Sequence, residues 1–302
     1  MAENQSPGKL NSVLVTGGTD GLGRAIAILL AERGYRVFAA GRSAERLEAL
    51  GQLAHERKLP LEPLELDVCD VASGERAIAD IERRAGPVDI LVNNAGIAIA
   101  AIMEEVTSAD LHKILETNFF SPIRLAQRVL PEMRRRRRGR IINISSISGK
   151  VAVPVMGAYA ASKYALEAAS DSMRLELYPF GIHVILIEPG YIHTNMNRNA
   201  AELSSAYGKG AERSPYREIY QTFLGQWEKT RKASSYQPED CARVVLRAIE
   251  DESPRARYVV TSRAKIGIFA RRLLSDHALD KRFKKAFRLD EFRESLTTGT
   301  KN

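Results

Sequence analysis

The stretch VLVTGGTDGLG, residues 13–23, places a short apolar run directly before a glycine-rich turn. Three of its glycines, Gly17, Gly21 and Gly23, follow the spacing G-x-x-x-G-x-G. Glycine permits positive φ angles and close approach of the backbone to a ligand, and the N-terminus of the following helix offers free N–H groups to phosphate. Such a turn alone could be only a tight strand-to-helix connection. Its position after the first predicted strand favours a dinucleotide-phosphate site.

Short apolar strands alternate with helices from this turn onward. The alternation predicts a parallel sheet covered by helices on both faces with right-handed connections, the doubly wound, Rossmann-like α/β fold. The predicted strands cover residues 13–15, 36–40, 61–66, 90–92, 141–144, 183–187 and 258–260. The predicted helices cover residues 24–33, a segment capped by Ser43, 77–85, 108–133 as one or two helices, 159–178 and 238–249.

A single domain is expected for the 302-residue chain, because no linker or internal repeat divides it. Residues 191–236 are polar and irregular in pattern, and we expect them to form an insertion that acts as a mobile lid over the substrate. Residues 262–302 should form a helical C-terminal extension beside that lid.

The composition is that of a globular protein, with 44% hydrophobic and 27% charged residues. Residues 1–10 lack the apolar core of a signal peptide, and no apolar run approaches the roughly 20 residues of a spanning helix. Two cysteines suit a reducing cytoplasm. The five histidines show no ligand spacing, so we expect no metal site.

The formal net charge of +8 permits anionic partners without choosing one. Its densest segment is the run from Arg134 to Arg138, followed by Arg140. This run could bind nucleic acid, but no aromatic residues alternate with it and no known binding module accompanies it. Cations also complement the dipole at a helix C-terminus. We therefore expect the run to end a helix, and we expect no specific nucleic-acid partner.

The end of the second strand distinguishes between cofactors. A carboxylate there would bind a ribose 2′-hydroxyl, whereas an arginine accommodates a 2′-phosphate. The chain carries Gly41-Arg42 at this point and no acid, which favours NADP(H). Arg42 could instead be a solvated loop residue. Asp20, a carboxylate within the glycine-rich turn, argues against this prediction because its charge would repel a 2′-phosphate nearby.

The chain resembles the short-chain dehydrogenase/reductase family from about Val13 to Thr194, with a weaker continuation to Val260. Each motif alone is weak, but all of them in order are specific. They are Thr16-Gly17-x-x-x-Gly21-x-Gly23, Asp67, Asn93-Asn94-Ala95-Gly96, Asn118, Ser146, Tyr159-x-x-x-Lys163, and Pro189-Gly190 with Thr194. The resemblance implies a nicotinamide-dependent enzyme that interconverts carbonyls and alcohols, and a homodimer or homotetramer.

The resemblance also implies the cofactor contacts. Asp67 should contact the adenine, Asn93 to Gly96 should pack beneath the cofactor, and Thr194 should hydrogen-bond the carboxamide. Together with Arg42, the expected NADP(H)-binding residues are Gly17, Thr19, Asp20, Gly21, Leu22, Asp67, Val68, Asn94, Ala95, Gly96, Tyr159, Lys163, Pro189, Gly190, Ile192 and Thr194.

Tyr159 and Lys163 are four residues apart on a predicted helix and therefore share one face. Lowering a tyrosine pKa by about 3 units takes roughly 4 kcal/mol. One ammonium about 4 Å away in a partly screened site supplies about that much. Tyr159 would then exchange a proton with the substrate oxygen. The resemblance implies that Ser146, preferred over Ser145 by its distance from the tyrosine, orients that oxygen and that Asn118 holds a water for a proton relay.

The expected substrate is bulky and lipophilic, because the candidate walls at residues 98–103 and 151–156 and at Tyr191 are mainly apolar. The insertion adds large aromatic residues, which could line a lid or pack as the insertion's own core. They are Tyr207, Tyr216, Tyr220, Phe223 and Trp227. The chain also resembles family members that act on steroids, retinoids or long-chain keto-lipids.

The C-terminal extension carries two apolar stripes at helical spacing with basic residues between them. The first consists of Ile266, Phe269, Ala270, Leu273 and Leu274, and the second of Leu279, Phe283, Ala286 and Phe287. A basic amphipathic helix can lie on an anionic membrane as a peripheral contact. The stripes could equally pack on the domain or on a second subunit.

Two functions from different classes fit these observations. The first is an NADP(H)-dependent oxidoreductase with Ser146, Tyr159 and Lys163 as its catalytic residues, together with Asn118 of the proton relay. The second is a non-catalytic NADP(H)-binding regulator or scaffold on the same fold. Loss of Ser146, Tyr159 or Lys163 would favour the second, and none of the three is lost.

Overall fold

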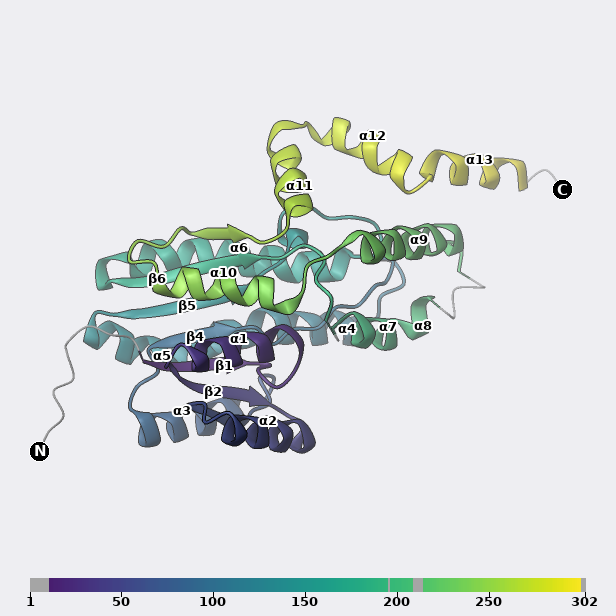
Figure 1. Ribbon diagram of the computed structural model, residues 1–302. Helices are drawn as coiled ribbons and strands as arrows, with labels where there is room; N and C mark the ends of the chain where they lie inside the picture. Colours follow the sequence, from purple (N-terminus) through teal and green to yellow (C-terminus); the bar gives the residue numbers. More distant parts are fainter. Residues whose placement is uncertain (1–10, 195, 209–213, 300–302) are drawn as a thin grey trace, which may run out of the picture.

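A computed structural model describes residues 11–194, 196–208 and 214–299 (Figure 1). Residues 1–10, from which we expected no signal peptide, lie outside the described residues. So do residue 195 and residues 209–213 of the predicted insertion and residues 300–302 of the C-terminal extension.

A seven-stranded, fully parallel sheet forms the centre of the domain, in the order β3-β2-β1-β4-β5-β6-β7. The strands are β1 (Ser12–Thr16), β2 (Arg36–Gly41), β3 (Leu61–Glu65), β4 (Ile90–Asn93), β5 (Gly139–Ile144), β6 (Ile182–Glu188) and β7 (Arg257–Val259). The strand order reverses between β1 and β4, and a crevice for a ligand opens at the carboxyl ends of the strands at such a point. The predicted doubly wound fold is confirmed.

Helices cover both faces of the sheet, as the alternating pattern predicted. One core joins the sheet to α1 (Gly21–Glu32), α2 (Ala44–Glu56) and α10 (Pro238–Glu250). The opposite core joins it to α3 (Val71–Ala85), α5 (Ser121–Arg136) and α6 (Gly157–Leu177). The helix α3 begins six residues before the predicted start, because the Asp70 side chain caps it by accepting a hydrogen bond from the Ala72 N–H.

The arginine run ends α5 and is used within the fold. Arg137 adopts the left-handed conformation that terminates the helix. Arg136 pairs with the buried Asp89, and Arg140 donates to the backbone carbonyls of Ala248 at 2.8 Å and Asp251 at 2.7 Å. These bonds support the expectation that much of the run is structural.

The insertion is helical, so the expected irregular structure was wrong. It contains α7 (Met196–Leu203), α8 (Ser205–Gly208) and α9 (Arg217–Ala233). In α9 the apolar residues Ile219, Tyr220, Phe223 and Trp227 recur at helical spacing, and the polar residues between them obscure the pattern in the sequence.

Three further helices, α11 (Ser262–Leu273), α12 (Asp276–Ala286) and α13 (Leu289–Gly299), form the C-terminal extension. In Figure 1 they leave the body after β7 and turn back above α9. The remaining elements are α4 (Ser108–Leu115), the π-helical turn η1 (Glu116–Phe120), and the 3₁₀ turns η2 (Ile147–Gly149) and η3 (Tyr178–Phe180). Within the described residues, no helix is long and apolar enough to cross a membrane.

Candidate active site

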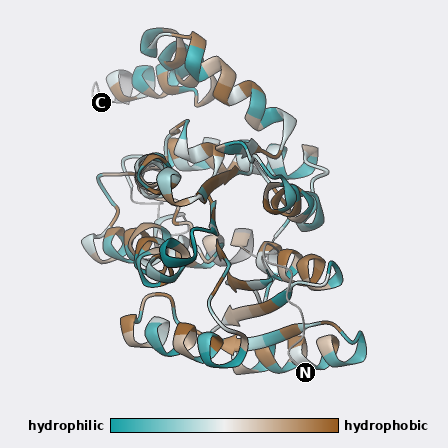
Figure 2. Cartoon of the chain, turned by 90° about the vertical axis from the view of Figure 1, so that its left-hand side faces the viewer, coloured by the Kyte–Doolittle hydropathy of each residue, from teal (hydrophilic) through white to brown (hydrophobic). Residues whose placement is uncertain are grey.

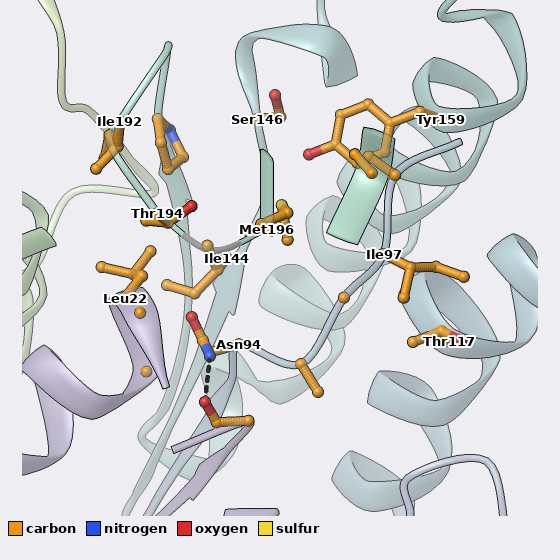
Figure 3. Close-up of a pocket in the computed structure, with 18 of the residues that line it drawn as sticks. Leu22, Asn94, Ile97, Thr117, Ile144, Ser146, Tyr159, Ile192, Thr194 and Met196 are labelled. Atoms are coloured by element: carbon orange, nitrogen blue, oxygen red, sulfur yellow. Dashed lines mark hydrogen bonds between the residues drawn. The ribbon is translucent and has the colours of Figure 1, made fainter. Parts of the chain in front are cut away.

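A cavity of about 1060 Å³ lies at the carboxyl ends of the strands and extends from the glycine-rich turn to Tyr159 (Figure 3). It is lined by every residue from Gly17 to Thr194 for which a cofactor contact was predicted. Ser146, Tyr159 and Lys163 line it as well, whereas Asn118 does not. The fold therefore brings residues from distant parts of the sequence to one elongated site.

The glycine-rich turn leaves no room for side chains. Gly17 has a φ of +62°, and a Cβ on Gly23 would lie 2.1 Å from the Gly17 carbonyl oxygen. Asp20 caps α1 by accepting a hydrogen bond from the Gly21 N–H at 2.7 Å. Capping explains why a carboxylate stands in a turn that we expected to hold phosphate. The backbone cradle thus fits a pyrophosphate at the helix N-terminus.

Two arginines lie at the end of the cavity beside β2. The Arg42 guanidinium lies 3.6 Å from the Asp67 carboxylate, and Arg46 donates to Asp20 at 2.9 Å. Arg46 therefore neutralises the acid that opposed the phosphate reading. The sequence argument missed Arg46, although its place four residues after Arg42, in the first turn of the helix capped by Ser43, is a usable signal. Two cations and a backbone cradle in one cavity fit a nicotinamide dinucleotide.

Asparagines at the end of β4 build the floor of this region. Asn94 donates through Nδ2 to the carbonyl oxygens of Thr16 at 2.9 Å and Gly17 at 3.3 Å. Its neighbour Asn93 is buried and donates to Asn143 on β5 at 2.9 Å. These amide bonds tie β4 to the glycine-rich turn and to the adjacent strand. The Asn93–Gly96 segment is therefore placed as structural support under the cavity.

The catalytic candidates meet at the other end of the cavity. In Figure 3 the hydroxyl groups of Ser146 and Tyr159 lie near each other in the pocket. Lys163 is buried on the same helix, and its Nζ donates to the Ile144 carbonyl at 2.8 Å. The Lys163 Nζ lies 5.9 Å from the centre of the Tyr159 ring. Tyr159 and Lys163 thus share a helix face, as predicted.

The expected lowering of the Tyr159 pKa is not found. Burial raises the pKa of Tyr159, and the hydrogen bond from Ser146 offsets this only in part. The Lys163 ammonium is hydrogen-bonded to the Ile144 carbonyl instead. Burial also lowers the pKa of Lys163 to about 8, against the effect of the Glu167 charge. In this state Tyr159 is a protonated phenol that can donate a proton.

Asn118 lies behind the cavity wall within the π-helical turn η1. Its Nδ2 donates to the Ile97 carbonyl at 2.8 Å and to Ser162 Oγ at 3.0 Å, and its Oδ1 accepts from the Ile97 N–H at 2.9 Å. These bonds hold the strand-end loop against α6. A role in a proton relay stays a prediction, and π-helical turns occur frequently at functional sites.

A cluster of buried charges lies beyond Lys163 and was missed from the sequence. Glu167, one turn after Lys163, pairs with Lys150 at 2.8 Å and with Arg257 at 3.0 Å. Arg257 also reaches the buried Glu188 at 3.3 Å. Burial and the Glu167 charge raise the pKa of Glu188 to about 7. Only the fold could reveal the cluster, because its members come from four separate segments.

The aromatic residues of the insertion divide into two groups. Tyr207 donates to Asp110, Tyr216 to Glu104, and Tyr220 to Glu105 at 2.7 Å. These bonds attach the insertion to the loop and helix after β4. Phe223 and Trp227 instead line the cavity, joined by Phe287 from the C-terminal extension. The tyrosines therefore attach the insertion to the body and do not form a core of its own, whereas Phe223 and Trp227 lie where a lid would contact the substrate.

Comparisons with known proteins agree with this geometry. A family model described as short chain dehydrogenase matches residues 11–204. The chain is 40% identical over 233 residues to the dehydrogenase/reductase SDR family member 7B of Bos taurus, covering 73% of this chain and 71% of the relative. It is 38% identical over 194 residues to the 3-ketodihydrosphingosine reductase of Bacteroides thetaiotaomicron, covering 64% of this chain and 68% of the relative.

Solved structures of similar proteins also include dehydrogenases and reductases. A short-chain dehydrogenase from Streptomyces avermitilis aligns with a TM-score of 0.71 and 30% identity, covering 97% of this chain and 100% of the other. An actinorhodin polyketide ketoreductase with NADPH aligns with a TM-score of 0.71 and 30% identity, covering 85% and 97%. The chain belongs to the short-chain dehydrogenase/reductase family, whose members are nicotinamide-dependent oxidoreductases that act on CH–OH and carbonyl groups.

Proposed function

We propose that the protein is an NADP(H)-dependent oxidoreductase that interconverts a ketone or aldehyde and an alcohol on a bulky lipophilic substrate. The observation that carries the proposal is one continuous cavity. It joins the glycine-rich turn and two arginines at one end to Ser146 and Tyr159 at the other, under an apolar wall. A scaffold without turnover would not need the buried Lys163 beside the tyrosine.

The bound nicotinamide supplies or accepts the hydride. The chain's own residues handle the oxygen atom of the substrate. Ser146 donates a hydrogen bond to that oxygen, and the protonated Tyr159 transfers its phenolic proton to it during reduction. Lys163, one turn along the helix, restores the balance of charge when the phenolate forms. In the direction of alcohol oxidation the same proton moves back to Tyr159.

The preference for NADP(H) rests on Arg42 and Arg46. Each can form a charge-assisted hydrogen bond to a 2′-phosphate, and the pairing of Arg46 with Asp20 removes a repulsive charge. Asp67 pairs with Arg42, which would orient that side chain toward the same group. One of the similar structures is described as a complex with NADPH, which supports the proposal by likeness.

The lipophilic substrate follows from the walls near Tyr159. Val153, Met156, Phe223, Trp227 and Phe287 contribute apolar surface. A relative that is named for reduction of 3-ketodihydrosphingosine points to long-chain keto-lipids as the class to test. A homodimer or homotetramer in the cytoplasm belongs to the same proposal.

A panel of ketones of increasing chain length, followed at the nicotinamide absorbance, tests the function. We expect turnover with NADPH, with kcat/KM rising with chain length because longer chains cover more of the apolar wall. Tyr159→Phe should abolish turnover, whereas Tyr178→Phe, at an exposed tyrosine directly after the end of α6, should not. Binding of NADPH without turnover of any ketone or alcohol would support the scaffold instead.

A further inference from the structure

The structure treats the two apolar stripes of the C-terminal extension differently. Leu279 and Phe287 of the second stripe are buried, and Phe287 reaches the cavity wall. In the first stripe Ile266, Phe269 and Leu273 are 69%, 64% and 67% exposed. The second stripe is therefore anchored on the domain by Leu279 and Phe287, whereas the three large side chains of the first face away from it.

The helix α11 has apolar residues on two sides, one packed on the domain and the other exposed. Ala264 and Ile268 are buried on the inner side, where Ala264 lies close to Gly190. Ile266, Phe269 and Leu273 are spaced by three and four residues and so form one continuous outer stripe. Figure 2 shows hydrophobic and hydrophilic residues alternating along these C-terminal helices. The inner side fixes the helix to the body, and the outer stripe is available to a partner.

Most of the chain's net charge lies in the segment that contains this stripe. Residues 262–288 contain nine lysines and arginines and two aspartates, a net charge of +7 out of +8 for the whole chain. The nine cations are Arg263, Lys265, Arg271, Arg272, Lys281, Arg282, Lys284, Lys285 and Arg288. Within the described residues, Arg271 forms an ion pair with Asp276, and Arg288 forms one with Glu291. The other seven cations form no ion pair with a described residue. The surface is therefore strongly cationic.

We propose that α11 and α12 dock on the surface of an anionic phospholipid bilayer. An exposed Ile–Phe–Leu stripe bordered by lysine and arginine matches the boundary between acyl chains and anionic headgroups. A second copy of the chain is a poorer occupant, because two faces of charge +7 repel each other. Nucleic acid would match the charge but would leave the apolar stripe without a role.

Docking there would also explain how a lipophilic substrate reaches the cavity, a step that rests on the proposed function. The extension connects the bilayer face to the cavity, because Gln226 on α9 donates to the Ala286 carbonyl at 3.0 Å and Phe287 lines the cavity. A substrate dissolved in the bilayer could then reach the apolar wall without crossing water.

Flotation of the full chain with vesicles, without substrate, tests the docking. We expect binding to phosphatidylcholine vesicles with about 30% phosphatidylserine and little binding to pure phosphatidylcholine. Lys284→Gln/Lys285→Gln should weaken binding more than tenfold, since each cation near an anionic leaflet contributes roughly fivefold. Ile266→Ser/Phe269→Ser/Leu273→Ser should weaken it at least as much, and these exposed positions should leave the circular dichroism spectrum unchanged.

Matched control variants distinguish binding through this surface from a nonspecific effect of positive charge or exposed apolar residues. Arg134→Gln/Arg138→Gln removes an exposed and a half-buried cation elsewhere, and Leu175→Ser/Tyr178→Ser removes exposed apolar groups on another face. Both control variants should bind like the parent. Equal losses in variants and controls would overturn the proposal, as would a parent that does not bind. A fall in molar mass of the apolar variant in light scattering, with vesicle binding intact, would assign the stripe to a second copy instead.

Turnover of a short, water-soluble ketone is measured in parallel. Vesicle binding without turnover would refute the proposed enzyme and leave the docking surface intact. Turnover without vesicle binding would refute only the docking surface.

Discussion

Replacing Arg46 with alanine should weaken NADPH binding more than replacing Arg42. The Arg42 side chain is 72% exposed and its ion pair with Asp67 is long, at 3.6 Å. The Arg46 side chain is 44% exposed and holds Asp20, the residue that caps α1, at 2.9 Å. If Arg46 binds the 2′-phosphate as proposed, its removal deletes that ligand and also leaves the Asp20 carboxylate without its Arg46 partner near the phosphate.

The magnitudes follow from these two environments. A hydrogen bond to a charged group contributes about 1.5–3 kcal/mol, and solvent screening places Arg42 at the lower end. Arg42→Ala should then raise the Kd for NADPH by about tenfold. Arg46→Ala adds repulsion from Asp20 and should approach the upper end, about a hundredfold. The Kd for NADH should change by less than about threefold in both, because NADH has no 2′-phosphate.

The only tryptophan of the chain, Trp227, lines the cavity, so its fluorescence should report cofactor binding. Arg24→Ala, at an exposed arginine on α1 outside the cavity lining, is the matched control. Adding Asp20→Asn to Arg46→Ala should restore part of the affinity, since asparagine also caps helices. Equal losses for NADPH and NADH, or a parent that prefers NADH, would refute the assignment of both arginines.

Three other predictions concern the catalytic end of the cavity. Tyr159→Phe should lower kcat by at least about a hundredfold while NADPH affinity, measured by titration, stays the same. The pKa of Glu188 is about 7 in the folded protein and 4.5 as its ordinary value. Between these two pH values the folded state therefore holds a proton on Glu188 that the unfolded chain has released. The parent's melting temperature should therefore fall as pH rises through this window, and Glu188→Gln should flatten that fall; an unchanged slope would contradict the buried-acid assignment. Phe287→Ala should raise KM for long-chain ketones more than for short ones, and an equal effect on both would place Phe287 outside the substrate path.

The sequence was sufficient for the sheet and for most of the cavity. Strands buried on both faces appear as short apolar runs, and parallel strands bring their carboxyl ends together, so residues as distant as Gly17 and Thr194 could be placed in one site. The geometry of the glycine-rich turn can be explained without the order of the other motifs. That geometry follows from the absence of space for a Cβ at Gly23.

Features that depend on the packing between elements escaped the sequence. Burial raises the pKa of Tyr159, and the Lys163 ammonium is hydrogen-bonded to the Ile144 carbonyl. Neither feature can be inferred from the four-residue spacing. The cluster around Glu167 and Glu188 brings together charges from separate segments. The helix α9 was missed because only part of its apolar face contacts the body, so polar residues dominate its sequence.

Because of the π-helical turn η1, the number of residues between α4 and α5 matters for the position of Asn118 as much as their identity does. It widens the helical path between α4 and α5 and carries Asn118 with its three bonds to Ile97 and Ser162. Deleting one residue here would convert the turn to regular α-helix and rotate α4 relative to α5 by about 100°. Asn118 would then point away from Ile97. Natural or engineered variants should accept substitutions between residues 108 and 136 far more readily than single-residue insertions or deletions.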